Sequence, residues 1–126
     1  MRRYKVAFME NAWFITNEDG EDLIVSFAIP IDDSGDVKSL TLLRTPQYEF
    51  ALEEFERGVK VSCEDLPNDR DEFLEKLTIE GNMVTIATDY GKYAVNIGNV
   101  EQEEIQKAKR ILNKMNFDGR FELNIV

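Results

Sequence analysis

Histidine is absent from this chain of 126 residues, and Cys63 is its single cysteine. The chain therefore lacks the commonest general base, the Ser-His and Cys-His nucleophile pairs and the usual zinc ligand. A lone cysteine forms no intramolecular disulfide, which fits a reducing compartment, and its alternation with Val59 and Val61 is typical of a core position. We expect no cofactor and no metal site, and the composition favours a protein that is not an enzyme.

Phosphate-binding loops and long apolar runs are also missing. Gly91 and Gly98 do not have the spacing of a nucleotide-binding loop, and no Gly-Lys-Ser/Thr sequence occurs. The apolar run LIVSFAIPI, residues 23–31, is far shorter than the roughly 20 residues of a membrane helix. Residues 1–10 alternate like a strand and hold no apolar stretch of signal-peptide length. We therefore expect a cytoplasmic protein that does not bind membranes.

Basic residues are too few to balance the acidic ones: 15 against 25, a net charge of −10. Residues 49–75 hold ten acids and three bases, a net of −7, whereas residues 1–48 hold eight and five, a net of −3, and residues 76–126 hold seven of each. Such a negative field repels phosphates, which argues against nucleic acid as a ligand. It attracts a basic protein or cations, although acids also simply keep a small protein soluble.

Residues 29–40, IPIDDSGDVKSL, raise the question of a calcium loop. An EF-hand loop that starts at Asp32 would place Val37 where glycine is needed and Leu43 where glutamate is needed. We therefore predict the turn of a β-hairpin, with adventitious calcium binding by Asp32, Asp33 and Asp36 as the alternative.

The segment TPQYEFALEEFERG, residues 45–58, carries the signals of an amphipathic helix. Thr45 suits the N-cap, Pro46 the first helical position and Gly58 the stop. A buried stripe is predicted at Tyr48, Ala51, Leu52 and Phe55, with Glu49, Glu53, Glu54 and Glu56 towards solvent.

A second amphipathic helix is predicted to begin at Asn99, with Gln102 completing a capping box. Its buried stripe is expected at Ile105, Ala108, Ile111, Leu112 and Met115.

Alternation of apolar residues predicts β-strands through most of the remaining chain. These stretches lie at residues 4–8, 12–16, 23–29, 36–44, 59–63, 77–79, 84–86, 93–97 and 121–125. We predict a single α+β domain over residues 1–126, with a mainly antiparallel sheet of about eight or nine strands and two amphipathic helices. The element order admits two βββαβ units.

No motif assigns a function. A small, acidic α+β chain without visible catalytic machinery is similar in composition to bacterial immunity proteins, antitoxins and anti-restriction inhibitors. We therefore predict a non-enzymatic interaction module, inhibitor-like or adaptor, whose acidic middle engages a basic protein surface. The partner-binding residues are expected to be Glu53, Glu54 and Glu56 on the outer helix face, Asp65, Asp69, Asp71 and Glu72 in the following loop, and Tyr90 at a turn.

Two other hypotheses remain open. The protein could instead bind a small molecule or a divalent cation in a pocket between sheet and helices, with acids as ligands and aromatic residues around the pocket. Independently of either function, an edge strand such as residues 120–125 could form a homodimer.

Overall fold

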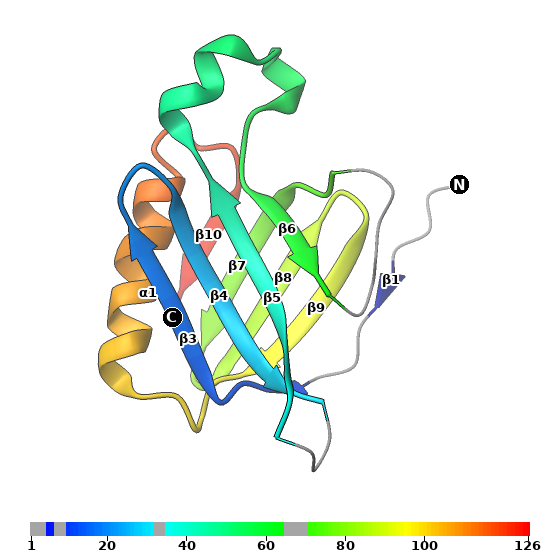
Figure 1. The fold of residues 1–126 in the computed structure, drawn as a ribbon, viewed down its shortest axis with the longest axis vertical. Coiled ribbons are helices and arrows are strands. Elements are labelled where there is room, and N and C mark those ends of the chain that lie inside the picture. The colour runs from blue at the N-terminus through cyan, green and yellow to red at the C-terminus, as the bar shows by residue number, and fades with distance from the viewer. Residues whose placement is uncertain (1–4, 7–9, 32–34, 65–70) are drawn as a thin grey trace.

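The computed structural model describes residues 5–6, 10–31, 35–64 and 71–126. Its strands form two sheets (Figure 1). The six-stranded sheet has the order β1-β9-β8-β7-β10, with β2 also pairing with β9, and the four-stranded sheet has the order β3-β4-β5-β6. The strands are β1 (Lys5–Val6), β2 (Glu10–Asn11), β3 (Phe14–Asp19), β4 (Leu23–Pro30), β5 (Val37–Arg44), β6 (Lys60–Cys63), β7 (Leu74–Glu80), β8 (Met83–Thr88), β9 (Gly91–Asn96) and β10 (Glu122–Ile125).

The predicted α+β architecture is confirmed in its main lines, but only one of the two expected helices exists among the described residues. This is α1 (Gln102–Met115), whose five predicted core residues are all buried. The N-cap is Glu101, which makes no side-chain capping hydrogen bond, so the predicted start at Asn99 with a capping box is wrong. No helix of the described residues has both the length and the apolarity needed to cross a bilayer.

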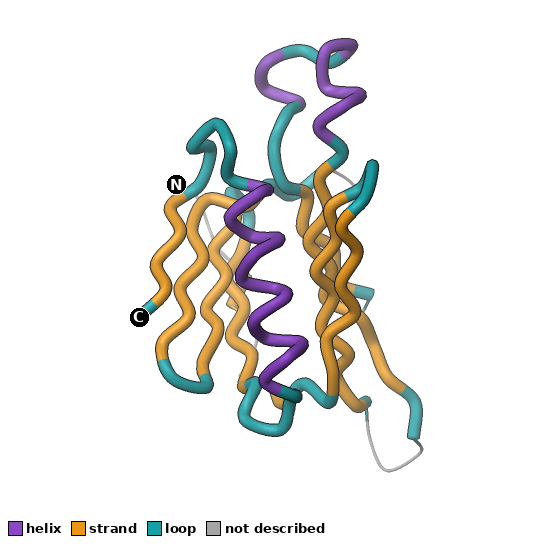
Figure 2. Tube along the Cα trace, turned by 90° about the vertical axis from the view of Figure 1, so that its left-hand side faces the viewer, coloured by secondary structure: helices purple, strands orange, loops and turns teal. Residues whose placement is uncertain are grey.

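The other predicted helix, over residues 45–58, is wrong. Two short 3₁₀ helices take its place, η1 (Pro46–Ala51) and η2 (Glu54–Glu56), separated by extended backbone. An α-helix in this position would need a surface on which to bury its apolar stripe. Instead, residues 46–57 rise beyond the ends of both sheets (Figures 1 and 2), and Phe55 is 79% exposed. We call residues 46–57 the projection.

The two halves of the chain share an element order but not a pairing scheme. In the first, β3, β4, β5 and β6 follow one another as antiparallel neighbours. In the second, β7, β8 and β9 form the same kind of meander, but α1 then carries the chain back across the sheet, and β10 pairs in parallel with β7. A helical crossover is the usual means of joining parallel strands, whereas the short 3₁₀ segment returns the chain to the neighbouring position.

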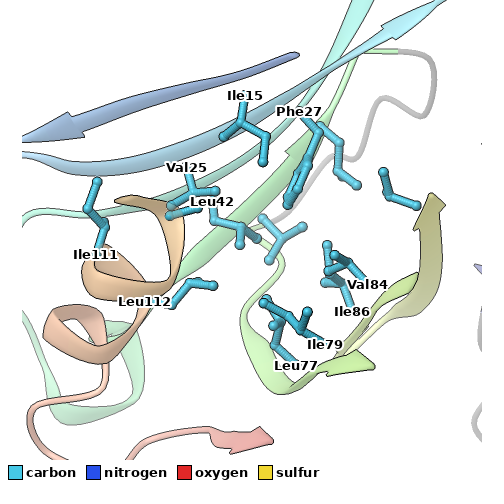
Figure 3. Close-up of a cluster of buried hydrophobic side chains, with 14 of the residues drawn as sticks. Ile15, Val25, Phe27, Leu42, Leu77, Ile79, Val84, Ile86, Ile111 and Leu112 are labelled. Carbon is cyan, nitrogen blue, oxygen red and sulfur yellow. The ribbon is translucent and has the colours of Figure 1, made fainter. Parts of the chain in front are cut away.

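The core lies between the sheets, and α1 packs along the side where they diverge (Figure 2). Figure 3 shows Phe27 and Leu42 of the four-stranded sheet facing Leu77 and Ile86 of the other, with Leu112 of α1 beside them. Cys63 is partly buried and packs against this cluster, close to the predicted core position.

The acidic stretch between β4 and β5 is a hairpin connection, as predicted. The two strands pair antiparallel from Leu23–Arg44 to Pro30–Val37. The Ile31 N–H donates to the Asp36 carbonyl oxygen at 3.0 Å, and Gly35 adopts a φ of +90°, which glycine tolerates without strain. Asp32 and Asp33 lie outside the described residues, so the calcium alternative stays a prediction.

Two alanine substitutions test the position of the core. We expect Leu112→Ala, in the buried stripe of α1, to lower the free energy of unfolding by about 2–5 kcal/mol. Phe55→Ala should change it by less than about 0.5 kcal/mol, because this ring is mostly in solvent. Urea unfolding followed by circular dichroism measures both. A large loss from Phe55→Ala would mean that the segment is an amphipathic helix after all.

Candidate functional site

The projection exposes aromatic rings in an acidic setting. Tyr48 and Phe50 of η1 and Phe55 of η2 are strongly exposed, Phe50 to 80%. Glu53, Glu54 and Glu56 are exposed between and beside them. Four acids and one base, Arg57, give residues 46–57 a net charge of −3. Large exposed apolar groups with a polar rim are the usual mark of a binding surface.

Arg44, at the end of β5, anchors the projection from below. Its side chain is fully buried and forms a two-bonded ion pair with Glu49 of η1, with Nε–Oε2 at 2.9 Å and Nη2–Oε1 at 2.8 Å. The same guanidinium donates to both carboxylate oxygens of Asp118, at 2.8 and 2.9 Å, and to the Met115 carbonyl oxygen at 2.7 Å. Arg44 therefore joins β5, η1 and the end of α1 at one point.

Phe117 also contacts Arg44. Its ring centroid lies 4.2 Å from the guanidinium carbon of Arg44, a cation–π distance, yet the ring is 60% exposed. We call Arg44, Glu49, Asp118 and Phe117 together the junction. One fully buried charge thus supports a further exposed aromatic side chain beside the base of the projection.

Arg120 makes a second connection between the same elements. It donates to Asp118 Oδ2 at 2.7 Å, pairs with the Glu54 carboxylate and donates to the Glu54 carbonyl oxygen at 3.1 Å. Within the projection, Arg57 donates from Nε and Nη2 to the Leu52 carbonyl oxygen. The Gly58 N–H donates to Glu49 Oε2 at 3.3 Å, at a glycine whose φ is +130°. These bonds hold a segment without long helices in one conformation.

The charges at the junction shift its titration. The hydrogen bond from Arg44, helped by Arg120, lowers the pKa of Asp118 well below its usual range, against the opposing effect of burial. Burial by itself would lower the pKa of Arg44, but the hydrogen bonds to Asp118 and Glu49 outweigh it and raise that pKa. Arg44 and Asp118 are therefore both charged at neutral pH.

The expected partner-binding residues fall into two groups. Glu53, Glu54 and Glu56 are exposed on the projection, although on 3₁₀ turns and not on a helix face. The carboxylates of Glu53 and Glu56 form no ion pair with any described residue, whereas Glu54 pairs with Arg120 and lies 3.6 Å from Arg57. Asp65 and Asp69 lie outside the described residues.

Asp71, Glu72 and Tyr90 form the second group, near the start of β7. Asp71 is exposed and lies 3.4 Å from Lys60 Nζ. Tyr90 is half-buried, and its N–H donates to Thr88 Oγ1 at 3.0 Å.

Glu72 does not have the exposed position that we expected, since only 4% of it is accessible. Its Oε1 accepts hydrogen bonds from Thr88 Oγ1 at 2.6 Å and from the Tyr93 hydroxyl at 2.8 Å. Burial, followed by the hydrogen bond to Glu72, raises the pKa of Tyr93. The sequence position of Glu72, in an acidic stretch before a strand, did not reveal these partners.

A shallow groove of about 390 Å³ between β3 and α1 is where a pocket ligand could bind. Its lining residues are Ile15, Asn17, Glu101, Glu103, Glu104 and Lys107. Glu104 is already engaged, since its Oε1 accepts from the Ile15 N–H at 2.8 Å. In the described ranges, no aromatic residue lines this groove, and no group of three acids or cysteines is placed to hold a metal ion.

The chain matches no model of a known protein family, no curated protein and no solved structure. The functional interpretation therefore depends on the chemistry of these surfaces.

Sequence reasoning missed Arg44 and Phe117 of the junction and Phe50 of the projection. Arg44 lies at the end of a predicted strand, and no sequence pattern singled out Phe117. The clue for Phe50 was its place off the predicted apolar stripe, where a phenylalanine has nothing to pack against.

Removal of the central charge should destabilise the protein strongly. In Arg44→Met the carboxylate of Glu49 stays buried without its partner, and we expect a loss of about 3–5 kcal/mol in the free energy of unfolding. The double variant Arg44→Met/Glu49→Met should recover a large part of that loss, because no buried charge is left unpaired. Chemical denaturation of the three proteins measures this. A single variant within about 1 kcal/mol of the wild type would show that Arg44 is not an anchor.

The ionised carboxylate of Asp118 should stabilise the folded protein in a way that depends on pH. Because the pKa of Asp118 is lowered in the folded state, its ionised form stabilises the fold above the unfolded-state pKa of about 3.9. This stabilisation declines as the pH falls below that value and is lost as the pH passes through the lower pKa of the folded state. We expect Asp118→Asn to melt below the wild type near neutral pH, with the difference shrinking under about pH 4. Glu53→Gln, which removes an exposed carboxylate without an ion pair to the described residues, is the control. A melting difference for Asp118→Asn that is constant over the whole pH range would contradict the role of this charge.

Proposed function

We propose that this protein is a non-enzymatic interaction module whose projection binds a positively charged protein surface. The observation that carries the proposal is the exposure of Tyr48, Phe50 and Phe55 on an acidic segment that two arginines anchor to the body. An inhibitor-like role of the immunity or antitoxin kind, or an adaptor role, agrees with this surface and with the net charge of −10.

The aromatic rings are suited to supply the affinity. Burying one phenylalanine side chain contributes about 1.5–3 kcal/mol, and aromatic residues are enriched among the few positions that dominate binding energies. Phe50 and Phe55 have almost all of their surface still to bury. Loss of either ring should therefore weaken binding by about tenfold or more.

The free carboxylates are suited to speed the encounter. Glu53 and Glu56 form no ion pair with the described residues and lie in the most acidic stretch of the chain, residues 49–75. Exposed charges of this kind act mainly on the association rate and make it sensitive to salt, while they add little to the affinity.

The arginine junction supports the proposal through preorganisation. A surface segment without long helices would ordinarily lose conformational entropy on binding, about 0.5–1.5 kcal/mol for each side chain that becomes ordered. Arg44, Arg120 and Arg57 already hold the projection through hydrogen bonds, so less of that loss is left for the binding step.

A matched set of variants tests the proposal. The wild-type protein, immobilised, is exposed to a lysate of its source organism at low and moderate salt, and any stoichiometric partner is identified by mass and then purified. Its affinity is measured for the wild type, for Phe50→Ala/Phe55→Ala and for Glu53→Lys/Glu56→Lys. The control Glu80→Lys/Glu103→Lys changes the net charge equally at the opposite end of the molecule (Figure 1).

We expect a basic partner whose affinity falls at least about 100-fold when both rings are removed. The Glu53→Lys/Glu56→Lys variant should associate more slowly and lose most of its salt dependence, whereas the control should resemble the wild type. If the control weakens binding as much as Glu53→Lys/Glu56→Lys, the partner responds only to total charge. If the ring variant binds normally, the projection is not the binding surface.

A further inference from the structure

Strand β10 has an open edge. It pairs in parallel with β7, and the N–H of the following residue, Val126, donates to the Ile79 carbonyl oxygen at 2.9 Å. Because alternate residues of a strand point their N–H and C=O to opposite sides, the backbone groups of Leu123 and Ile125 are directed away from β7. Among the described residues these four groups have no hydrogen-bond partner.

The edges of the four-stranded sheet are covered, in contrast. At β3, the Ile15 N–H donates to the side chain of Glu104, and α1 runs alongside. At β6, the Val61 N–H donates to the Glu72 carbonyl oxygen at 2.8 Å, and the Leu74 N–H donates to the Val59 carbonyl oxygen at 2.9 Å.

Strand β10 also lacks three of the features that prevent edge pairing in other proteins. It contains no proline, no lysine and no bulge. Leu123 packs against the core, and Ile125, on the same face, is 39% exposed because no strand lies beside it. An added strand would bury this apolar row and pair the free backbone groups.

We propose that the occupant of this edge is a second copy of the chain, with the two β10 strands antiparallel about a two-fold axis at Asn124. Leu123 then lies opposite Ile125 of the second copy, and four backbone hydrogen bonds form between these two residue pairs. Asn124 lies opposite Asn124 of the second copy, and the two side-chain amides can form hydrogen bonds to each other. Glu122, the only charged side chain of β10, lies opposite the uncharged side chain of Val126 and not opposite a second Glu122.

The charge distribution favours this pairing despite the total of −10. Residues 76–126, which include β10 and most of β7, hold seven acids and seven bases, and the excess of acids lies in residues 1–75. Two copies that meet at β10 therefore bring together their neutral parts. Two short strands bury less than the roughly 1,200 Å² of a standard stable interface, so the dimer should form only at high concentration.

This dimer does not depend on the proposed function, because β10 and the projection are separate surfaces. Sedimentation equilibrium in the presence of a reductant, which prevents cross-linking through Cys63, measures the mass from about 5 to about 500 µM. We expect the weight-average mass to rise from 14.6 kDa towards twice that value over this range.

Two variants should block pairing at the open edge of β10 while they leave the hydrogen bonds between β10 and β7 intact. Ile125→Pro eliminates an outward N–H, and Ile125→Lys places a charge on the edge. Both should weaken the dimer at least about tenfold. Ile31→Lys is the matched control, since Ile31 is also exposed, to 53%, and lies outside β10. If Ile125→Pro fails to fold, Ile125→Lys alone decides.

Three results would overturn the proposal. The wild type could remain at 14.6 kDa throughout the range. Ile125→Lys could associate as tightly as Ile31→Lys. Phe50→Ala/Phe55→Ala could abolish the dimer, which would assign it to the projection.

Discussion

The conformation of the projection depends on the hydrogen bonds of one buried group, the guanidinium of Arg44. It donates two hydrogen bonds to Glu49, two to Asp118 and one to the Met115 carbonyl oxygen, so β5, η1 and the end of α1 meet around one charge. A charge buried in this way is tolerated only when its donors are satisfied. The projection therefore has its shape because of an ionic anchor below it, and not because of an apolar face of its own.

That anchor explains how aromatic rings can stand exposed on a short irregular segment. A helix stabilised by packing would have turned Tyr48 and Phe55 inward, and the acids outward. Here Glu49, the acid closest to the body, is turned inward to Arg44, and the rings are left in solvent. Because the acid is buried and the aromatic rings are exposed, the projection is a candidate binding surface.

The two halves of the chain show how one connecting segment decides a pairing scheme. Both present three antiparallel strands, a helical segment and a fourth strand. Because α1 is long enough to cross the sheet, β10 reaches the far side of β7 and becomes an open edge. Because η1 and η2 are short, the chain returns beside β5 as β6. The proposed dimer edge and the projection are thus consequences of the same difference in connection length.

Sequence patterns determined the features that depend on neighbouring residues along the chain. Alternation located most strands, the spacing of Ile105, Ala108, Ile111, Leu112 and Met115 identified the buried face of α1, and Asp-Ser-Gly signals located a hairpin connection. Tertiary structure alone decided whether residues 46–57 had a surface to pack on, since their helical signals were as good as those of α1. It also decided that Glu72 is buried against Thr88 and Tyr93, and that Arg44 meets Glu49 and Asp118. These outcomes join residues far apart in sequence, and no local pattern encodes such contacts.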